Sequence, residues 1–143
     1  YSYGGGVYSG GTFTMSGGEI SGNTSRAVSG GSSCSAYSYG GGVYSAGTFT
    51  MYGGLISGNT VSSSSWGNTA SYGGGVYGNF IKTTGSNGTS GIIYGSDATV
   101  NSLKNTAGVS GDAVYCSSEK YRNTTVGETV SLSSGNTDNW IDL

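Results

Sequence analysis

Tyrosines at regular spacing are the residues of this chain best suited to binding chemistry. Tyr8, Tyr44 and Tyr77 each end a Gly-Gly-Gly-Val-Tyr run, and Tyr39 and Tyr72 each precede one. A tyrosine combines a flat apolar ring with a hydrogen-bonding tip, which suits the apolar faces and polar rims of sugar rings. In a strand, the residue after an inward-facing valine points outward. We therefore predict two exposed tyrosine columns, one of Tyr8, Tyr44, Tyr77 and Tyr115 and one of Tyr3, Tyr39 and Tyr72. A low glycine strip separates them, and together they bind a saccharide.

Tyr37 and Trp66 extend this candidate surface, because both lie in variable segments next to the repeats. A tryptophan in a loop belongs to no column, so ligand binding explains it better than stacking does. The columns have a second interpretation, since stacked identical side chains stabilise β structure without any ligand. The aromatic residues thus indicate either a ligand platform or a structural ladder.

The seven acidic residues do not form a catalytic pattern. None recurs at a repeat position, and Glu19 is matched by Leu55. Glycoside hydrolysis needs two carboxyl groups that face one bond. Asp97 and Asp112 could approach each other across a turn, but their spacing does not require it, and the chain has no histidine. We expect that the chain is not an enzyme and that it requires no cofactor and no metal ion.

Charge and cysteine content narrow the possible partners. The chain has five Lys and Arg residues without a cluster, too few to neutralise many phosphates of a nucleic acid. No apolar run approaches the length that spans a membrane. Cys34 and Cys116 are either two free thiols or a disulfide, which secretion would permit. We expect neither nucleic acid nor a membrane as a partner.

The tyrosines belong to a sequence repeat that predicts how they are positioned. The first glycines of successive repeats are Gly4, Gly40, Gly73 and Gly111, so the offsets are 36, 33 and 38 residues. A period in this range indicates a stacked array, in which each repeat buries its apolar face against its neighbours. A binding site in such an array is a column of equivalent residues.

The first repeat contains three candidate strands, 5–8, 12–16 and 19–21, separated by glycine turns. This pattern predicts an all-β fold, a right-handed parallel β-helix of about four coils with three short strands per coil. A β-propeller is the alternative, but it requires four strands per blade. Asn23, Asn59 and Asn105 each precede a threonine and predict an internal asparagine ladder at a turn.

We expect a single domain over residues 1–143. Residues 1–110 hold the regular repeats, with loop insertions at 25–38 and 61–71. Residues 111–143 are more divergent and more charged, which is typical of a C-terminal capping coil with one uncovered face. The start of the chain copies residues 37–39, so the chain looks like a segment of a longer protein.

The motifs GGGVY, GTFTM, ISGNT and the later IYGSDA and RNTT resemble glycine-rich repeats of secreted bacterial proteins with a pectate-lyase-like β-helix. The resemblance implies a non-catalytic carbohydrate-binding module that recognises a plant cell-wall polysaccharide, with xylan or another neutral β-linked glycan as first guess. It implies a secreted or cell-surface location, and a longer chain that carries a glycoside hydrolase or a surface domain. The alternative is a structural or adhesive repeat segment of a bacterial surface protein.

Overall fold

The computed structural model describes residues 1–82, 91–95, 100–109, 111–116, 120–125, 128–132 and 135–137, and within them it is all-β apart from the 3₁₀ turn η1 (Asn101–Leu103). The helical structure in these ranges includes nothing long and apolar enough to cross a membrane. The strands are β1 Ser2–Tyr3, β2 Val7–Ser9, β3 Phe13–Met15, β4 Glu19–Ser21, β5 Thr24–Val28, β6 Ala36–Tyr39, β7 Val43–Met51, β8 Leu55–Ser57, β9 Thr60–Ser64, β10 Thr69–Tyr72, β11 Val76–Lys82, β12 Ile92–Ile93, β13 Thr106–Ala107, β14 Val114–Cys116, β15 Lys120–Thr125, β16 Glu128–Leu132 and β17 Gly135–Thr137.

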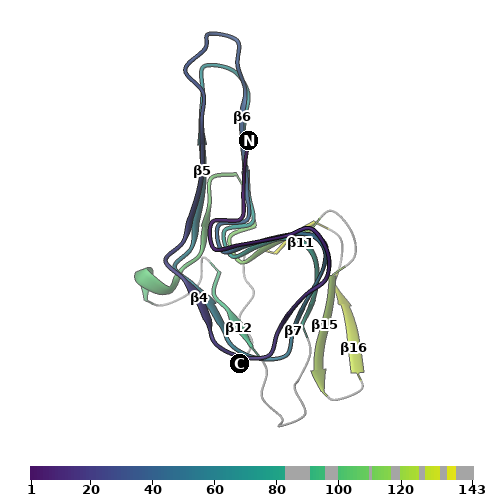
Figure 1. The fold of residues 1–143 in the computed structure, drawn as a ribbon. Helices are drawn as coiled ribbons and strands as arrows, with labels where there is room; N and C mark the ends of the chain where they lie inside the picture. The colour runs from purple at the N-terminus through teal and green to yellow at the C-terminus, as the bar shows by residue number, and fades with distance from the viewer. Residues whose placement is uncertain are drawn as a thin grey trace.

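Equivalent strands of successive repeats pair in parallel and in register (Figure 1). β2 and β11 both pair with β7, so Val7, Val43 and Val76 lie in one row. Three further parallel sheets have the orders β1–β6–β10, β4–β8–β12 and β5–β9–β13. The predicted all-β architecture of stacked parallel strands is therefore confirmed.

One apolar core runs through the stack. In β7, Phe49 and Met51 point inward and are completely buried, while Thr50 between them lies on the opposite face, as the period of two requires. The rings of Phe13 and Phe80 lie 5.0 and 5.1 Å from the ring of Phe49. The buried core cluster consists of Met15, Val43, Phe49, Met51, Ile56, Val76, Phe80, Ile93, Ala113 and Val114.

Two of the sheets extend from the core as an arm (Figure 1). We define the arm as sheets β1–β6–β10 and β5–β9–β13, and the body as the remaining parallel strands. The two arm sheets face each other through small side chains. The hydroxyls of Ser25 and Ser38 are 2.9 Å apart, those of Ser63 and Ser71 are 2.7 Å apart, and Ala36 is buried nearby in β6. Small residues allow two sheets to pack closely with their polar groups paired.

The prediction of loop insertions at 25–38 and 61–71 is wrong, because both segments contribute strands to the arm. Along β5, Ser25 and Ala27 are buried while Arg26 and Val28 are exposed. This is the period of a half-buried strand. The buried face of β5 carries serine and alanine where a typical strand has large apolar residues. The sequence therefore gives no hydrophobic alternation that would predict a strand here.

The prediction of three strands per coil is also wrong. The first repeat contains five strands, β1 to β5. Its three predicted strands correspond to β2, β3 and β4, whereas β1 and β5 belong to the arm. The additional strands have the same physical origin as the missed arm, namely a sheet interface built from serine and alanine.

Glycine allows the sharp corner where the arm meets the body. Gly4, Gly40, Gly73 and Gly111 have φ angles of 62°, 67°, 73° and 80°. This left-handed region is costly for any residue with a Cβ. The recurring glycine therefore determines where the chain turns from each arm strand into the valine-tyrosine strand of the body.

The predicted asparagine ladder is confirmed. Asn59 Oδ1 accepts hydrogen bonds from the backbone N–H and the Nδ2 of Asn23, at 2.9 and 3.0 Å. Asn105 Oδ1 accepts the same pair from Asn59, both at 2.9 Å. The amide nitrogens of Asn59 and Asn105 also donate to backbone carbonyls, those of Ile20 and Ile56 respectively. The ladder satisfies buried backbone groups at the turn in each repeat.

The parallel pattern changes at the C-terminal end. β14 pairs in parallel with β11 and antiparallel with β17, and β15 pairs antiparallel with β16. The pairing with β17 occupies the edge of β14 that lies away from β11, whereas β15 pairs with β16 on one edge and with β11 on the other. The role of residues 111–143 as a capping coil stays a prediction.

Candidate functional site

A column of four tyrosine rings covers the valine-tyrosine strands of the body. The centroids of Tyr8, Tyr44, Tyr77 and Tyr115 follow one another at 5.3, 5.4 and 5.4 Å. The interplanar angles are 4°, 5° and 8°. Parallel pairing places equivalent residues one strand spacing apart, which is why the rings stack in register. The valine before each tyrosine points into the core, as predicted.

The arm carries further stacked tyrosines on β1, β6 and β10. Tyr3 and Tyr39 stack at 5.4 Å, and Tyr39 and Tyr72 at 6.2 Å. Tyr1 stacks on Tyr37 at 5.1 Å. Tyr37 is therefore a strand residue on the same face as Tyr39, not a residue of a loop insertion. The structure brings it into the surface for which it was predicted.

The body and arm columns touch each other. The ring centroids of Tyr3 and Tyr44 are 4.8 Å apart, as are those of Tyr39 and Tyr77. The predicted low glycine strip between the columns is therefore wrong, because the rings close over it. The glycines serve backbone packing instead: Gly41 is buried, and a Cβ there would lie 2.7 Å from the Thr60 carbonyl carbon.

A glycine of the same strip provides a test of this close packing. In Gly74→Ala, the new Cβ would lie 2.6 Å from the Asp112 carbonyl oxygen and 2.6 Å from the Thr106 nitrogen. We expect the free energy of unfolding to fall by roughly 1–3 kcal/mol, the usual cost of overpacking. Gly10→Ala is the matched control, because nothing lies within 4 Å of that position. Equal melting temperatures for the two variants would contradict close backbone packing at Gly74.

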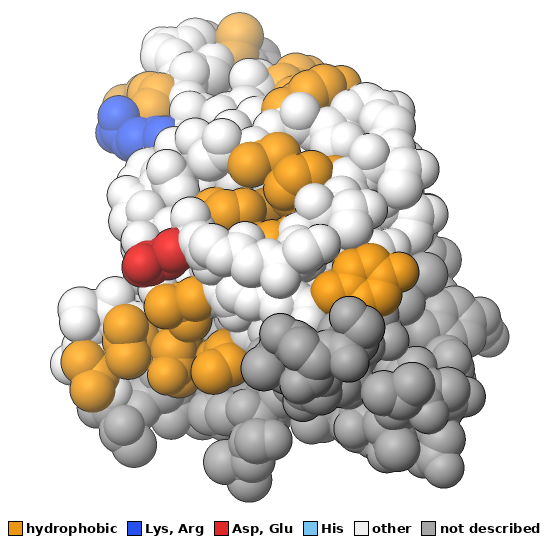
Figure 2. Space-filling model, turned by 60° about the horizontal axis from the view of Figure 1, so that its bottom comes forward, with side chains coloured by type: hydrophobic (Ala, Val, Ile, Leu, Met, Phe, Trp, Pro, Cys, Tyr) orange, Lys and Arg blue, Asp and Glu red, His pale blue; other side chains and the backbone are white. Residues whose placement is uncertain are grey.

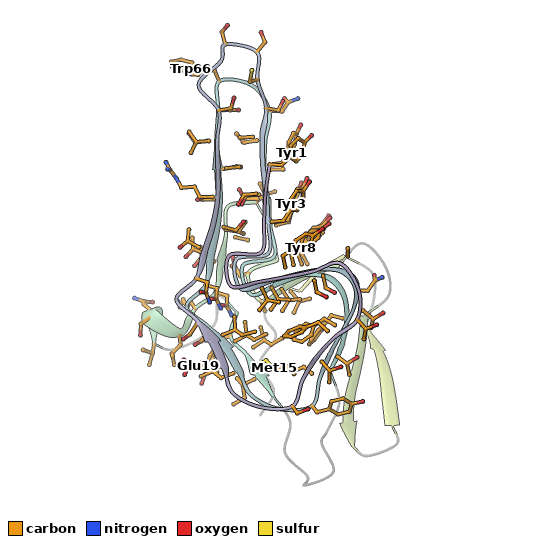
Figure 3. All side chains as sticks on the ribbon, in the orientation of Figure 1. Tyr1, Tyr3, Tyr8, Met15, Glu19 and Trp66 are labelled. Carbon is orange, nitrogen blue, oxygen red and sulfur yellow. The ribbon has the colours of Figure 1, made fainter. Side chains whose placement is uncertain are left out.

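The stacked tyrosines line the inner corner between arm and body (Figure 3). In that view Tyr1 and Tyr3 point from the arm into the corner, Tyr8 points into it from the body, and their hydroxyl oxygens lie outermost. We name this surface the tyrosine corner. It consists of Tyr1, Tyr3, Tyr8, Tyr37, Tyr39, Tyr44, Tyr72, Tyr77 and Tyr115.

Comparisons with known proteins assign no family. No protein-family model matches the chain, and no curated protein and no solved structure matches it significantly. The function is therefore inferred from the site itself.

Trp66 does not belong to the tyrosine corner. Its side chain is 83% exposed and lies at the far end of the arm, on the side away from the labelled tyrosines (Figure 3). The prediction that Trp66 extends the same surface is wrong. Residues 61–71 contribute to β9 and β10, one strand in each of the two facing arm sheets, and Trp66 lies in the short connection between them.

Burial and neighbouring phenols change the acidity of the tyrosine corner. Burial raises the pKa of Tyr39 above its ordinary 10.0, and the nearby Tyr3 phenol raises it further. The pKa of Tyr44 is raised by burial first, and then by Tyr3 and Tyr8. In each case the cause disfavours the phenolate, because the ionised form loses hydration or meets a like charge.

These shifts predict a loss of stability in alkali. A pKa that is higher in the folded chain contributes stability that is complete below about pH 10, and that is lost as pH rises through the folded value. We expect the melting temperature to fall as pH passes 10.0, with tyrosinate absorbance rising in the same range. Tyr39→Phe and Tyr44→Phe should each weaken this pH dependence. If the melting temperature of each variant fell with pH as steeply as that of the unaltered chain, the assignment would be contradicted.

The described acidic residues include Asp112 and Glu19. Asp112 Oδ1 accepts a hydrogen bond from the Ala107 backbone N–H at 2.7 Å, while Asp97 lies outside the described residues. Glu19 is exposed in the first repeat. The described part of the chain contains no group of three or more His, Cys, Asp or Glu residues that could hold a metal ion. Cys34 is an exposed free thiol.

The first-repeat tyrosines Tyr1 and Tyr3 and the last-repeat Tyr115 complete the columns. Tyr3 and Tyr115 belong to the predicted columns, whereas Tyr1 was not predicted. Tyr1 and Tyr3 copy Tyr37 and Tyr39, and Tyr115 follows the valine of the last repeat. Aligning the repeats on their first glycine would also have placed Tyr1 beside Tyr37.

Proposed function

We propose that this chain is a non-catalytic module that binds a neutral polysaccharide through the tyrosine corner. The observation that carries the proposal is a continuous set of stacked tyrosines whose hydroxyls point into an open corner (Figure 3). Tyr3 and Tyr8 are 40% and 61% exposed, so ring surface is accessible as well as the hydroxyls. Phenol rings with hydrogen-bonding tips match the mixed surface of a sugar.

The charge distribution favours a neutral ligand. The net charge is −2 and charged residues make up 8% of the chain. On the face that Figure 2 shows, few of the described side chains are charged. A ligand with many phosphates or carboxylates would need cations that this surface does not supply. Xylan or another neutral β-linked plant cell-wall glycan stays the first candidate, on the resemblance of the repeats.

The spacing of the columns favours a polymer. Equivalent hydroxyls recur with each repeat, because the rings of one column stand 5.3–5.4 Å apart. A polymer that lies along the stack meets the same group at each repeat, so its contacts multiply with chain length.

The wider architecture in this proposal is a right-handed parallel β-helix of about four coils. Its setting is a secreted or surface-attached bacterial chain that also carries a glycoside hydrolase or a surface domain.

Native affinity electrophoresis tests the proposal directly. The chain is run through gels that contain xylan, mixed-linkage glucan, xyloglucan or pectin, and we expect retardation by one neutral glycan. Tyr44→Ala and Tyr77→Ala should each weaken binding by more than about tenfold, as expected for central aromatic contacts. Tyr52→Ala is the matched control, because Tyr52 is 39% exposed and lies outside the tyrosine corner. Failure of every gel to retard the chain would contradict the proposal.

A structural or adhesive repeat segment is the second candidate, and one observation favours it. Within the body column the rings lie face to face with interplanar angles of 4–8°, so neighbouring rings cover much of each other's faces. Such contacts contribute about 0.5–1.5 kcal/mol per pair without any ligand. Tyr44→Phe and Tyr77→Phe separate the two functions, since they keep the stack and remove the hydroxyls. If the chain binds a glycan, both variants should lose affinity for it while their melting temperatures stay unchanged.

The absence of catalysis belongs to the same proposal. Incubation of the chain at high concentration with pectin should release neither reducing ends nor unsaturated products. Either product would show that the chain is an enzyme, because a binding module releases the polymer unchanged.

A further inference from the structure

The first repeat leaves one side of the stack uncovered. β1 pairs with β6, β2 and β3 pair with β7, β4 pairs with β8, and β5 pairs with β9. In the ranges that the structure describes, no strand pairs with the other edge of β1 to β5. We name this side the open face. Unpaired strand edges with exposed N–H and C=O groups are templates for further pairing.

The open face also exposes the end of the core. Val7, Phe13 and Ile20 are only partly buried, whereas Val43, Phe49 and Ile56 at the same positions of the second repeat are fully buried. Two shallow hollows of about 360 and 370 Å³ adjoin these residues and Glu19. Figure 2 shows hydrophobic side chains lying open between polar groups on the side that includes this region.

The asparagine ladder is unfinished at the open face. Asn59 Oδ1 and Asn105 Oδ1 each accept two hydrogen bonds from the asparagine of the preceding repeat. For Asn23, the described structure contains the donated half of this pattern and no donor to its own Oδ1. An asparagine placed one repeat earlier would donate its backbone N–H and its Nδ2 to that oxygen.

We propose that the open face is a docking surface for one further repeat of the same pattern, paired in parallel and in register with β1 to β5. Each observation above specifies the incoming group: a valine on Val7, a phenylalanine on Phe13, an isoleucine on Ile20 and an asparagine on Asn23. The first repeat already makes these same contacts with the second repeat. The new repeat also lengthens the tyrosine columns beyond Tyr3 and Tyr8.

The geometry favours a repeat over a second copy of this chain. Two copies related by a twofold axis would place their strand edges antiparallel and bring the two Asn23 ladder ends together without the donors that each Oδ1 needs. A head-to-tail copy would need the edge of β14 that lies away from β11, and β17 already pairs there. The open face has little of the usual protection of an edge, because the chain has no proline and β1 to β5 carry only two charged residues, Glu19 and Arg26.

A duplicated repeat tests the proposal. A copy of residues 1–36 is fused directly before Tyr1 of the full chain, which reproduces the native junction between Ala36 and Tyr37. We expect the amides of β2, β3 and β4 to exchange at least about tenfold more slowly, because their edge becomes paired. The melting temperature should rise as well.

The matched control is the same fusion with serine in place of Val7, Phe13 and Ile20 of the added copy only. It has the same length and the same junction, but it cannot extend the core, so exchange in the original first repeat should match that of the unextended chain. Equal protection in the two fusions, or protection in neither, would overturn the proposal. Sedimentation of the unextended chain as a dimer that Phe13→Arg dissociates would also overturn it, in favour of a second copy.

Discussion

Phe49→Ala is expected to lower the free energy of unfolding by about 3–5 kcal/mol, the cost of removing a buried aromatic ring. Phe49 has no exposed surface and lies between Phe13 and Phe80, at ring-centroid distances of 5.0 and 5.1 Å. The parallel strands hold these neighbours at fixed spacing, so the cavity cannot collapse easily. Small domains have only about 5–15 kcal/mol of stability, so a large fraction is lost. Chemical denaturation monitored by circular dichroism measures the effect.

Phe13→Ala is the matched control for Phe49→Ala. The two residues occupy the same row, paired between β3 and β7, but Phe13 lies at the open face and is only partly buried. Its removal should cost clearly less, because water already reaches one side of the ring. A loss for Phe13→Ala equal to that for Phe49→Ala would show that the core is covered at the open face. A small loss for Phe49→Ala would contradict a continuous core.

Asn59→Asp is expected to destabilise the chain by about 3 kcal/mol or more at neutral pH. The amide nitrogen of Asn59 donates to the Ile20 carbonyl and to Asn105 Oδ1, both at 2.9 Å, and the residue has no exposed surface. A carboxylate there removes the side-chain donor to the Ile20 carbonyl and leaves Asn105 Oδ1 with the Asn59 backbone N–H alone. Each lost hydrogen bond costs roughly 1–3 kcal/mol, and the carboxylate also brings a charge into the interior. Equilibrium unfolding in urea measures the loss.

The same variant should regain part of its stability in acid. The surrounding oxygens and burial raise the pKa of the introduced acid above the ordinary value of about 3.9. Its protonated form donates one hydrogen bond, so the stability gained is complete below that pH and is lost as pH rises through the folded value. Asn59→Ala cannot titrate and is the control. Parallel pH profiles for the two variants would contradict a role for the donated hydrogen bond.

Together the two variants separate the two kinds of column in this fold. The phenylalanine row contributes by excluding water, and the asparagine ladder contributes by satisfying backbone groups at the turn. Both kinds depend on register, because a slip of one residue would turn every side chain to the opposite face. The tyrosine corner is a third column set, on the outer surface, and it inherits its order from the same register.

Several features followed from the sequence by itself. Recurrence of Gly-Gly-Gly-Val-Tyr predicted a stacked all-β array with valines inside and tyrosines outside. Asn23, Asn59 and Asn105 predicted the asparagine ladder. These predictions succeeded because a repeat in register makes each residue the neighbour of its own copy, so local pattern and tertiary contact coincide.

Only the tertiary structure decided the arm, the closed glycine strip and the place of Trp66. The arm strands pack through serine and alanine, as at Ser25 and Ala36, so no hydrophobic period marked them. The contact of Tyr3 with Tyr44 depends on the angle between arm and body, which the left-handed Gly4 and Gly40 produce. Position along the chain predicts which residues share a column. The direction in which two sheets meet depends on backbone angles and close packing, and these are decided by contacts between the sheets.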